Sequence, residues 1–369
     1  MKTAREKIKD AFWHYIKEKP YDKIRVSEII DYAEVNRSTF YRNFEDVIAL
    51  YDEVCSDLVD ENFNTMPRID LSLGVIDAIS DMTVRALTPE NAERIRLIVG
   101  VNGGGRAILL MRERFKEKLM HDLGDPVKWT EDMQCMATFC ADYLTVTGLY
   151  ILYSDSISFD NDHSIEYSFD YACDPIETFG DVLQMLNGGP KDIHLSVFLS
   201  TVKLFTKSDA RAESITKLLS YSGFSRTVFY RVYNNKQDYF KKLGSAVDLI
   251  AVHGLMPLIT EGSPHAFDIL LEQWERHCVA VERKALILAF RDGYAYELGA
   301  SAVAHLTAAY IDYLTERRGE ALDEETKRYA AFFINSVVCC LTHYYTSLDR
   351  ERFFRRMELL YKLRDEMKI

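Results

Sequence analysis

The chain has 369 residues, of which 48% are apolar and 28% are charged, and it carries a formal net charge of −12. This balance is typical of a folded soluble protein with roughly two to three domains. Seven cysteines with no C-x-x-C pair exclude a disulfide framework and indicate reduced thiols in a cytoplasmic protein. No apolar run is long enough to span a membrane, and the charged N-terminus is unlike a secretory signal, so we expect no membrane contact.

The first predicted elements are three helices followed by a fourth. Residues 5–19 place apolar side chains on one face of an amphipathic helix, and residues 26–33 form a short second helix. The third helix lies in 36–44 with Asn36 at its N-cap, and the fourth begins in 45–54. Helical spacing continues along the chain, and no alternating run reads as a strand, which predicts an all-α fold.

The third helix has one apolar face. Phe40 and Phe44 are four residues apart and anchor that face in a core, which leaves the outward positions to Arg37, Ser38, Tyr41 and Arg42. A short helix, a tight turn and a helix bearing Arg, Tyr and hydroxyls are typical of a helix-turn-helix that enters the DNA major groove. The alternative is that Tyr41 and Arg42 only cover a solvated helix surface. The basic residues that precede them favour DNA.

The string Arg-x-x-Phe-Tyr-Arg occurs twice, with Phe40 and Phe229 separated by 189 residues. At the same offset apolar positions match without gaps over the first fifty residues of each copy, and 93–105 resembles 282–294. The turn-rich segment 187–192 is the expected junction. Chance similarity is the alternative, but identical Arg, Tyr and Arg residues at one offset disfavour it. The chain therefore reads as a tandem duplication of units 1–188 and 192–369.

The third helix ends in Thr39-Phe40-Tyr41-Arg42-Asn43-Phe44. This string is similar to the T-(F/L)-Y-x-x-F pattern of TetR-family transcriptional repressors, and residues 4–54 resemble the DNA-binding domain of that family. The resemblance implies a helix-turn-helix head and a helical regulatory and dimerising body in each unit. The implied ranges are 1–54 for the first head, 55–188 for its body, 192–243 for a degenerate second head and 244–369 for its body.

The two heads depart from the family pattern at different positions. Where the family usually has a Thr or Ser cap, a turn Gly and a Lys opening the fourth helix, the first head has Arg25, Glu34 and Val47. The second head has Ser214, Gly223 and Lys236 there, but Val228 and Tyr233 replace Thr39 and Phe44. We therefore expect unequal contacts with DNA. The expected contact residues are Asn36, Arg37, Ser38, Thr39, Tyr41 and Arg42 in the first head, and Ser225, Arg226, Thr227, Tyr230, Arg231 and Lys236 in the second.

Two such units in one chain predict a dimer formed in cis. This monomeric pseudo-dimer would read an imperfect palindrome in double-stranded DNA, with a higher oligomer as the alternative. We expect a four-helix interface with Phe139, Leu149, Phe333 and Leu341 in its core. Its helices would lie at about 129–153, 173–187, 323–347 and 350–367.

The expected function is a ligand-responsive repressor. The alternative is a regulatory adaptor in which one or both heads no longer bind DNA and instead bind a protein partner. Catalysis, a cofactor and a metal site are not expected, because the histidines show no H-E-x-x-H motif and no paired-carboxylate spacing.

The resemblance also implies a pocket for a small-molecule effector among the helices of each body. The aromatic candidates for its lining are Trp129, Tyr143, Tyr150, Trp274, His305, Tyr310 and Tyr313. Ordinary core packing is the alternative for each of them. The acidic, aromatic segment 154–174 has no equivalent in the second unit and is read as a lid, a cap or an exposed insertion. The sequence identifies no effector.

Overall fold

The computed structural model describes residues 2–65, 78, 89–99, 106–124, 129–153, 193–205, 210, 213–268, 270–272 and 296–369. Every regular element in these ranges is a helix, which confirms the expected all-α class. None of these helices contains an apolar stretch that could cross a bilayer. The five cysteines of these ranges are buried and form no disulfide.

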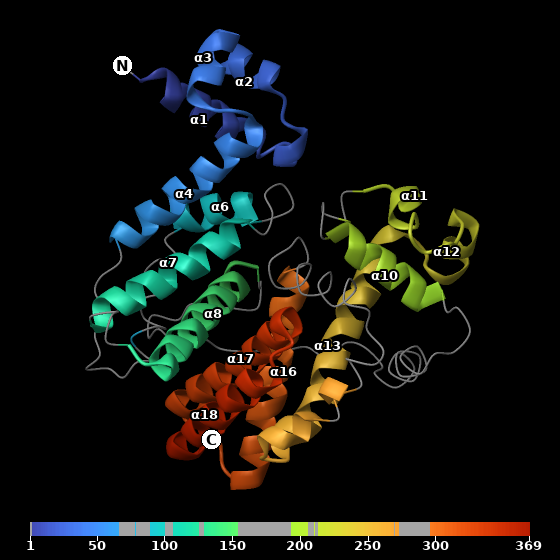
Figure 1. Cartoon of the computed structure of the whole chain (residues 1–369). Helices are drawn as coiled ribbons and strands as arrows, with labels where there is room; N and C mark the ends of the chain where they lie inside the picture. The colour runs from blue at the N-terminus through green and yellow to red at the C-terminus, as the bar shows by residue number, and fades with distance from the viewer. Residues whose placement is uncertain are drawn as a thin grey trace.

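The four helices predicted within the first head are present (Figure 1), although the first ends at Tyr15 rather than at residue 19. Its helices are α1 (Ala4–Tyr15), α2 (Val26–Ala33), α3 (Arg37–Asn43) and α4 (Val47–Thr65), with a short 3-10 helix between α1 and α2. Thr3 begins α1 with a capping box, in which its side chain accepts from Glu6 N and Glu6 accepts in return from Thr3 N at 2.7 Å. The apolar faces meet in a core that includes Ile8, Phe12, Ile29, Phe40, Phe44 and Tyr51.

This core continues into the next two helices, α6 (Pro89–Val99) and α7 (Arg106–Leu123). The buried Tyr51 hydroxyl donates to the Ile98 carbonyl at 3.0 Å, and α7 packs along α4. The first head is therefore joined to α6 and α7 by a shared apolar core.

The second head has its own core. Its helices are α10 (Ile193–Phe205), α11 (Ile215–Leu218), α12 (Arg226–Val232) and the long α13 (Lys236–Thr260). Phe229 and Tyr233 of α12 are buried against Tyr239 of α13. Tyr239 also shares a 2.6 Å hydrogen bond with Thr201 of α10, and burial raises the pKa of its phenol. The two heads lie apart in Figure 1.

The largest core lies between helices from the two halves of the chain: α8 (Glu131–Tyr153), α16 (Tyr296–Arg318), α17 (Glu324–Ser347) and α18 (Arg350–Met367). α8 runs beside α17 in Figure 1, and the Tyr143 and Phe332 rings of these helices meet edge to face with centroids 5.7 Å apart. Phe139, Phe333 and Leu341 are all buried there.

Three of the four expected interface helices thus share one core. Packing of α16 against α8 was not expected from the sequence. Several other expectations fall outside the described residues: the fourth interface helix (173–187), the junction 187–192, the insertion 154–174 and the segment 282–294. The side chain of Leu149 is also outside them.

Candidate nucleic-acid interface

The turn between α2 and α3 is fixed by local hydrogen bonds. Arg25 N, at the start of α2, donates to the Glu28 carboxylate at 2.8 Å. Glu34 ends the helix in the left-handed region with φ 52°, and Val35 N then donates back to Ile30 O at 3.1 Å. α3 begins directly after this turn, so its direction follows from the turn.

Asn36 caps α3 as the sequence predicted, and its Oδ1 accepts from Thr39 N at 2.8 Å and from Ser38 Oγ at 2.7 Å. Phe40 and Phe44 are buried, so α3 is held by one face. Asn36, Arg37, Ser38, Tyr41 and Arg42 are exposed, and Thr39 is half-buried.

The exposed side chains of α3 contact one another. The Arg37 guanidinium lies 5.7 Å from the centroid of the Tyr41 ring, within the range of a cation–π contact. Tyr41 is 48% exposed, and its ring stands edge-on to buried Phe40 at 5.4 Å. Arg42 Nη2 reaches Thr39 Oγ1 at 3.4 Å, a long and weak hydrogen bond. A cation, a phenol and a second cation are thus presented on one side of a short helix.

α12 presents the same arrangement in the second head. Ser225 caps the helix through Val228 N at 3.4 Å. Phe229 is buried, Tyr230 is 47% exposed, and their rings meet at 5.4 Å and 89°, as those of Phe40 and Tyr41 do. Arg226, Thr227 and Arg231 are exposed. In both helices the recurring string therefore buries the Phe and exposes the Tyr and Arg that follow it.

The Lys236 side chain makes a hydrogen bond within the second head. Lys236 begins α13, and its ammonium donates to the Glu213 carbonyl at 3.2 Å. Asn235, just before it, caps α13 by accepting from Asp238 N at 2.8 Å. The side chain is half-buried, unlike the arginines of α12.

The basic residues of α1 also have acidic partners. Arg5 forms an ion pair with Glu53 of α4 and donates to the Asn43 carbonyl at the end of α3 at 3.2 Å. Lys9 lies 2.5 Å from both Glu53 and Asp57. Partial burial opposes ionisation of Glu53, but hydrogen bonds from Arg5 and Lys9 lower the pKa of this carboxyl. These two cations therefore fasten α1 to α4, a role that the sequence did not reveal.

The predicted effector residues are spread through the large core. Tyr143 and Tyr310 are buried, and Tyr310 stacks on Tyr313 with centroids 6.0 Å apart and contacts Phe333. His305 lies 3.2 Å from Asp248 of α13, and Trp129 is half-buried just before α8. Trp274 and the side chain of Tyr150 lie outside the described residues. Packing against core aromatic rings accounts for the burial of Tyr143 and Tyr310.

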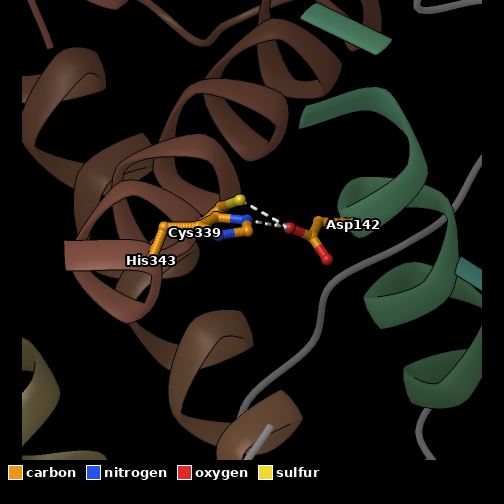
Figure 2. A group of neighbouring side chains, drawn as sticks. All are labelled: Asp142, Cys339 and His343. Carbon is orange, nitrogen blue, oxygen red and sulfur yellow. Dashed lines mark hydrogen bonds and ion pairs between the residues drawn. The ribbon is translucent and has the colours of Figure 1, made fainter. Parts of the chain in front are cut away.

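Sequence reasoning missed a buried polar cluster between α8 and α17. Asp142 of α8 forms an ion pair with Arg112 of α7 at 2.8 Å and faces Cys339 and His343 of α17 (Figure 2). Cys339 and His343 are four residues apart, which places them on one helix face and was the available signal. Nothing in the sequence connects them with Asp142, 197 residues from Cys339.

A scan of the sequence against protein-family models finds no match, and a search of the curated proteins also finds none.

Proposed function

We propose that the chain is a DNA-binding transcriptional regulator that reads an imperfect palindrome with two non-identical recognition helices, α3 and α12. The observation that carries the proposal is the matched presentation of these helices. In each, a buried Phe fixes the helix, and the Tyr and Arg that follow it are exposed at the same offset of 189 residues.

Each exposed group has a role in this proposal. Arg37 and Arg42 fork onto guanine edges or phosphates, and the Tyr41 hydroxyl donates to a phosphate oxygen. Arg226, Tyr230 and Arg231 do the same in the second half-site. The exposed caps Asn36 and Ser225 lie at the helix N-termini, where backbone N–H groups favour an anion. The net charge of −12 does not oppose this, because the arginines of α3 and α12 form local patches.

The pairing of the heads is proposed to be intramolecular. The packing of α8 against α17 and α18 supports it, because these helices come from different halves of the chain. In such a cytoplasmic pseudo-dimer, the spacing of α3 and α12 is set by the shared core, and a small-molecule effector that shifts this spacing weakens DNA binding, as in a repressor.

Selection of bound sequences from a random DNA pool tests the proposal. Enrichment of two unequal half-sites about one helical turn apart supports it. The Arg42→Ala and Arg231→Ala variants assign each half-site, because each should reduce the contribution of one half-site to binding. Arg352→Ala, which removes an exposed cation from α18, is the matched control and should leave the enriched site unchanged.

An adaptor is the second candidate, and the ion pairs of α1 favour it. Arg5 and Lys9 are engaged with Glu53, which reduces the positive charge available at the first head. In this proposal the exposed Tyr32 and Tyr41 contact a protein partner. Binding of the purified chain to its enriched DNA at low salt, and loss of that binding at high salt, excludes an adaptor in which both heads have lost DNA binding. The absence of DNA binding at low salt selects it.

A further inference from the structure

The buried cluster of Asp142, Cys339 and His343 lies where helices of the two halves meet. Asp142 and Cys339 are each 4% exposed, and His343 is half-buried. One donor atom from each residue lies within 4.8 Å of the other two. Figure 2 shows the three side chains converging from α17 on one side and α8 on the other. Three groups with metal-binding atoms thus meet between α8 and α17.

The two oxygens of the Asp142 carboxylate face different helices. Arg112 holds Oδ1 of Asp142 at 2.8 Å. Oδ2 faces α17, where it accepts from the Cys339 thiol and lies 3.9 Å from Nε2 of His343. Donor atoms around a tetrahedral ion lie roughly 3.5 Å apart, given metal–ligand bonds of about 2.0–2.3 Å. Small rotamer shifts would therefore bring these three atoms to coordination distance.

The donor set selects the kind of ion. A thiolate, an imidazole and a carboxylate suit Zn²⁺, whereas Mg²⁺ and Ca²⁺ require oxygen ligands. The four-residue separation of Cys339 and His343 supplies two ligands from one helix face, and α8 supplies the third. Arg112 acts as the outer partner that orients the carboxylate, as such partners do at zinc sites.

From this geometry we propose that Asp142, Cys339 and His343 bind one Zn²⁺ ion between α8 and α17. Binding replaces the Cys339 thiol proton, which passes to solvent, and uses the neutral imidazole of His343 through Nε2. The fourth position is left to water. The ion would link α8 to α17 directly.

The cluster occurs once in the tandem repeat. At the offset of 189 residues, Asp142 corresponds to Ala331, Cys339 to Tyr150 and His343 to Ser154, none of which repeats the donor set. One site per chain is therefore expected, rather than the two that a symmetric pair would contain. The inference does not depend on DNA binding.

Titration of the chelator-treated full chain with Zn²⁺ and with Co²⁺ tests the proposal. We expect binding of one Zn²⁺ per chain, a rise in the unfolding temperature, and a thiolate-to-cobalt charge-transfer band with Co²⁺. Cys339→Ser should abolish the band. His343→Gln, at a half-buried position, should weaken Zn²⁺ binding at least about tenfold, since even the loss of an outer partner costs 10- to 100-fold at such sites.

Cys135→Ser is the matched control, because Cys135 is a buried thiol of α8 outside the cluster. It should keep both the band and the affinity. The proposal is overturned if the wild-type chain gives no charge-transfer band, or if Cys339→Ser and His343→Gln bind Zn²⁺ as tightly as Cys135→Ser does.

Discussion

Glu34 and Gly223 occupy the same turn of the two heads and share a left-handed backbone, with φ 52° at Glu34 and 75° at Gly223. A residue with a Cβ pays roughly 1–2 kcal/mol for this conformation, whereas glycine adopts it freely. The two heads therefore keep the geometry of the turn at different energetic cost.

Replacing Glu34 by glycine should stabilise the first head. We expect the Glu34→Gly variant to raise the free energy of unfolding by about 0.5–1 kcal/mol, because the relieved strain is partly offset by the greater freedom of glycine in the unfolded chain. Urea denaturation followed by circular dichroism measures the change. Gly223→Ala is the converse control. Its added Cβ would meet no atom within 4 Å, so the expected loss of about 1 kcal/mol reflects φ alone. Destabilisation by Glu34→Gly would contradict this account of the turn.

Removal of the Tyr41 hydroxyl should weaken DNA binding without affecting the fold. Tyr41→Phe keeps the ring that packs edge-on against Phe40, while it removes the group proposed to reach a phosphate. We expect an affinity loss of about 2- to 10-fold, corresponding to a hydrogen bond of about 0.5–1.5 kcal/mol, with an unchanged unfolding temperature. Fluorescence anisotropy with the selected DNA provides the measurement. The paired variant Tyr230→Phe reports on the second head, and equal null effects from both would count against groove binding by α3 and α12.

The salt dependence should identify the residues that contact phosphate. An arginine that neutralises one phosphate contributes about one unit to the slope of log affinity against log salt concentration. Arg42→Ala and Arg231→Ala are therefore each expected to lower this slope by about 1, and Arg352→Ala on α18 should leave it unchanged. An unchanged slope in both head variants would show that neither arginine reaches the backbone.

The contact between His305 and Asp248 should make stability depend on pH. The hydrogen bond from His305 to Asp248 raises the pKa of the imidazole, against a smaller effect of burial. The stabilisation is therefore complete below the unfolded pKa of about 6.5 and is lost as pH rises through the higher folded pKa. Urea denaturation between about pH 6 and pH 8 should show wild type losing more stability than His305→Gln. Parallel profiles for the two proteins would refute the assignment. Asp248→Asn should flatten the profile in the same way.

The ion pair of Arg112 and Asp142 should be costly to break, because both side chains are more than nine-tenths buried. Arg112→Met leaves an uncompensated carboxylate, and we expect a loss of about 3–5 kcal/mol. The double variant Arg112→Met with Asp142→Leu removes both charges and should recover most of that loss. A double-mutant cycle by chemical denaturation measures the coupling, and a single-variant cost below about 1 kcal/mol would mean that water screens the pair.

Helices α3 and α12 were predictable because their signals are local. The cap at Asn36, the buried spacing of Phe40 and Phe44, and the recurrence of Phe229 can all be read within ten residues of each other or at one fixed offset. Each signal specifies a backbone direction and a buried face. Together they predicted the exposure of Tyr41 and Tyr230 without reference to the rest of the molecule.

The remaining features depend on distant partners. In the sequence Arg5 is one of several basic residues that precede α3. Its acidic partner Glu53 lies 48 residues further along the chain, and only the packing of α1 against α4 brings the two together. Likewise, the apolar pattern of α8 shows that the helix is buried but does not say that α17 covers it. No local pattern around Asp142 indicates its partners, and only the fold brings Arg112, Cys339 and His343 around it.

The core shared by α8 and α17 has a consequence for how the protein responds to dilution. A dimer of separate subunits loses its interface as concentration falls, because dissociation becomes favourable. Here the two sides of the contact belong to one covalent chain, and the local concentration of each side around the other does not change. The midpoint of unfolding should therefore be the same at nanomolar and micromolar protein, and the spacing of the two heads should persist at a few copies per cell.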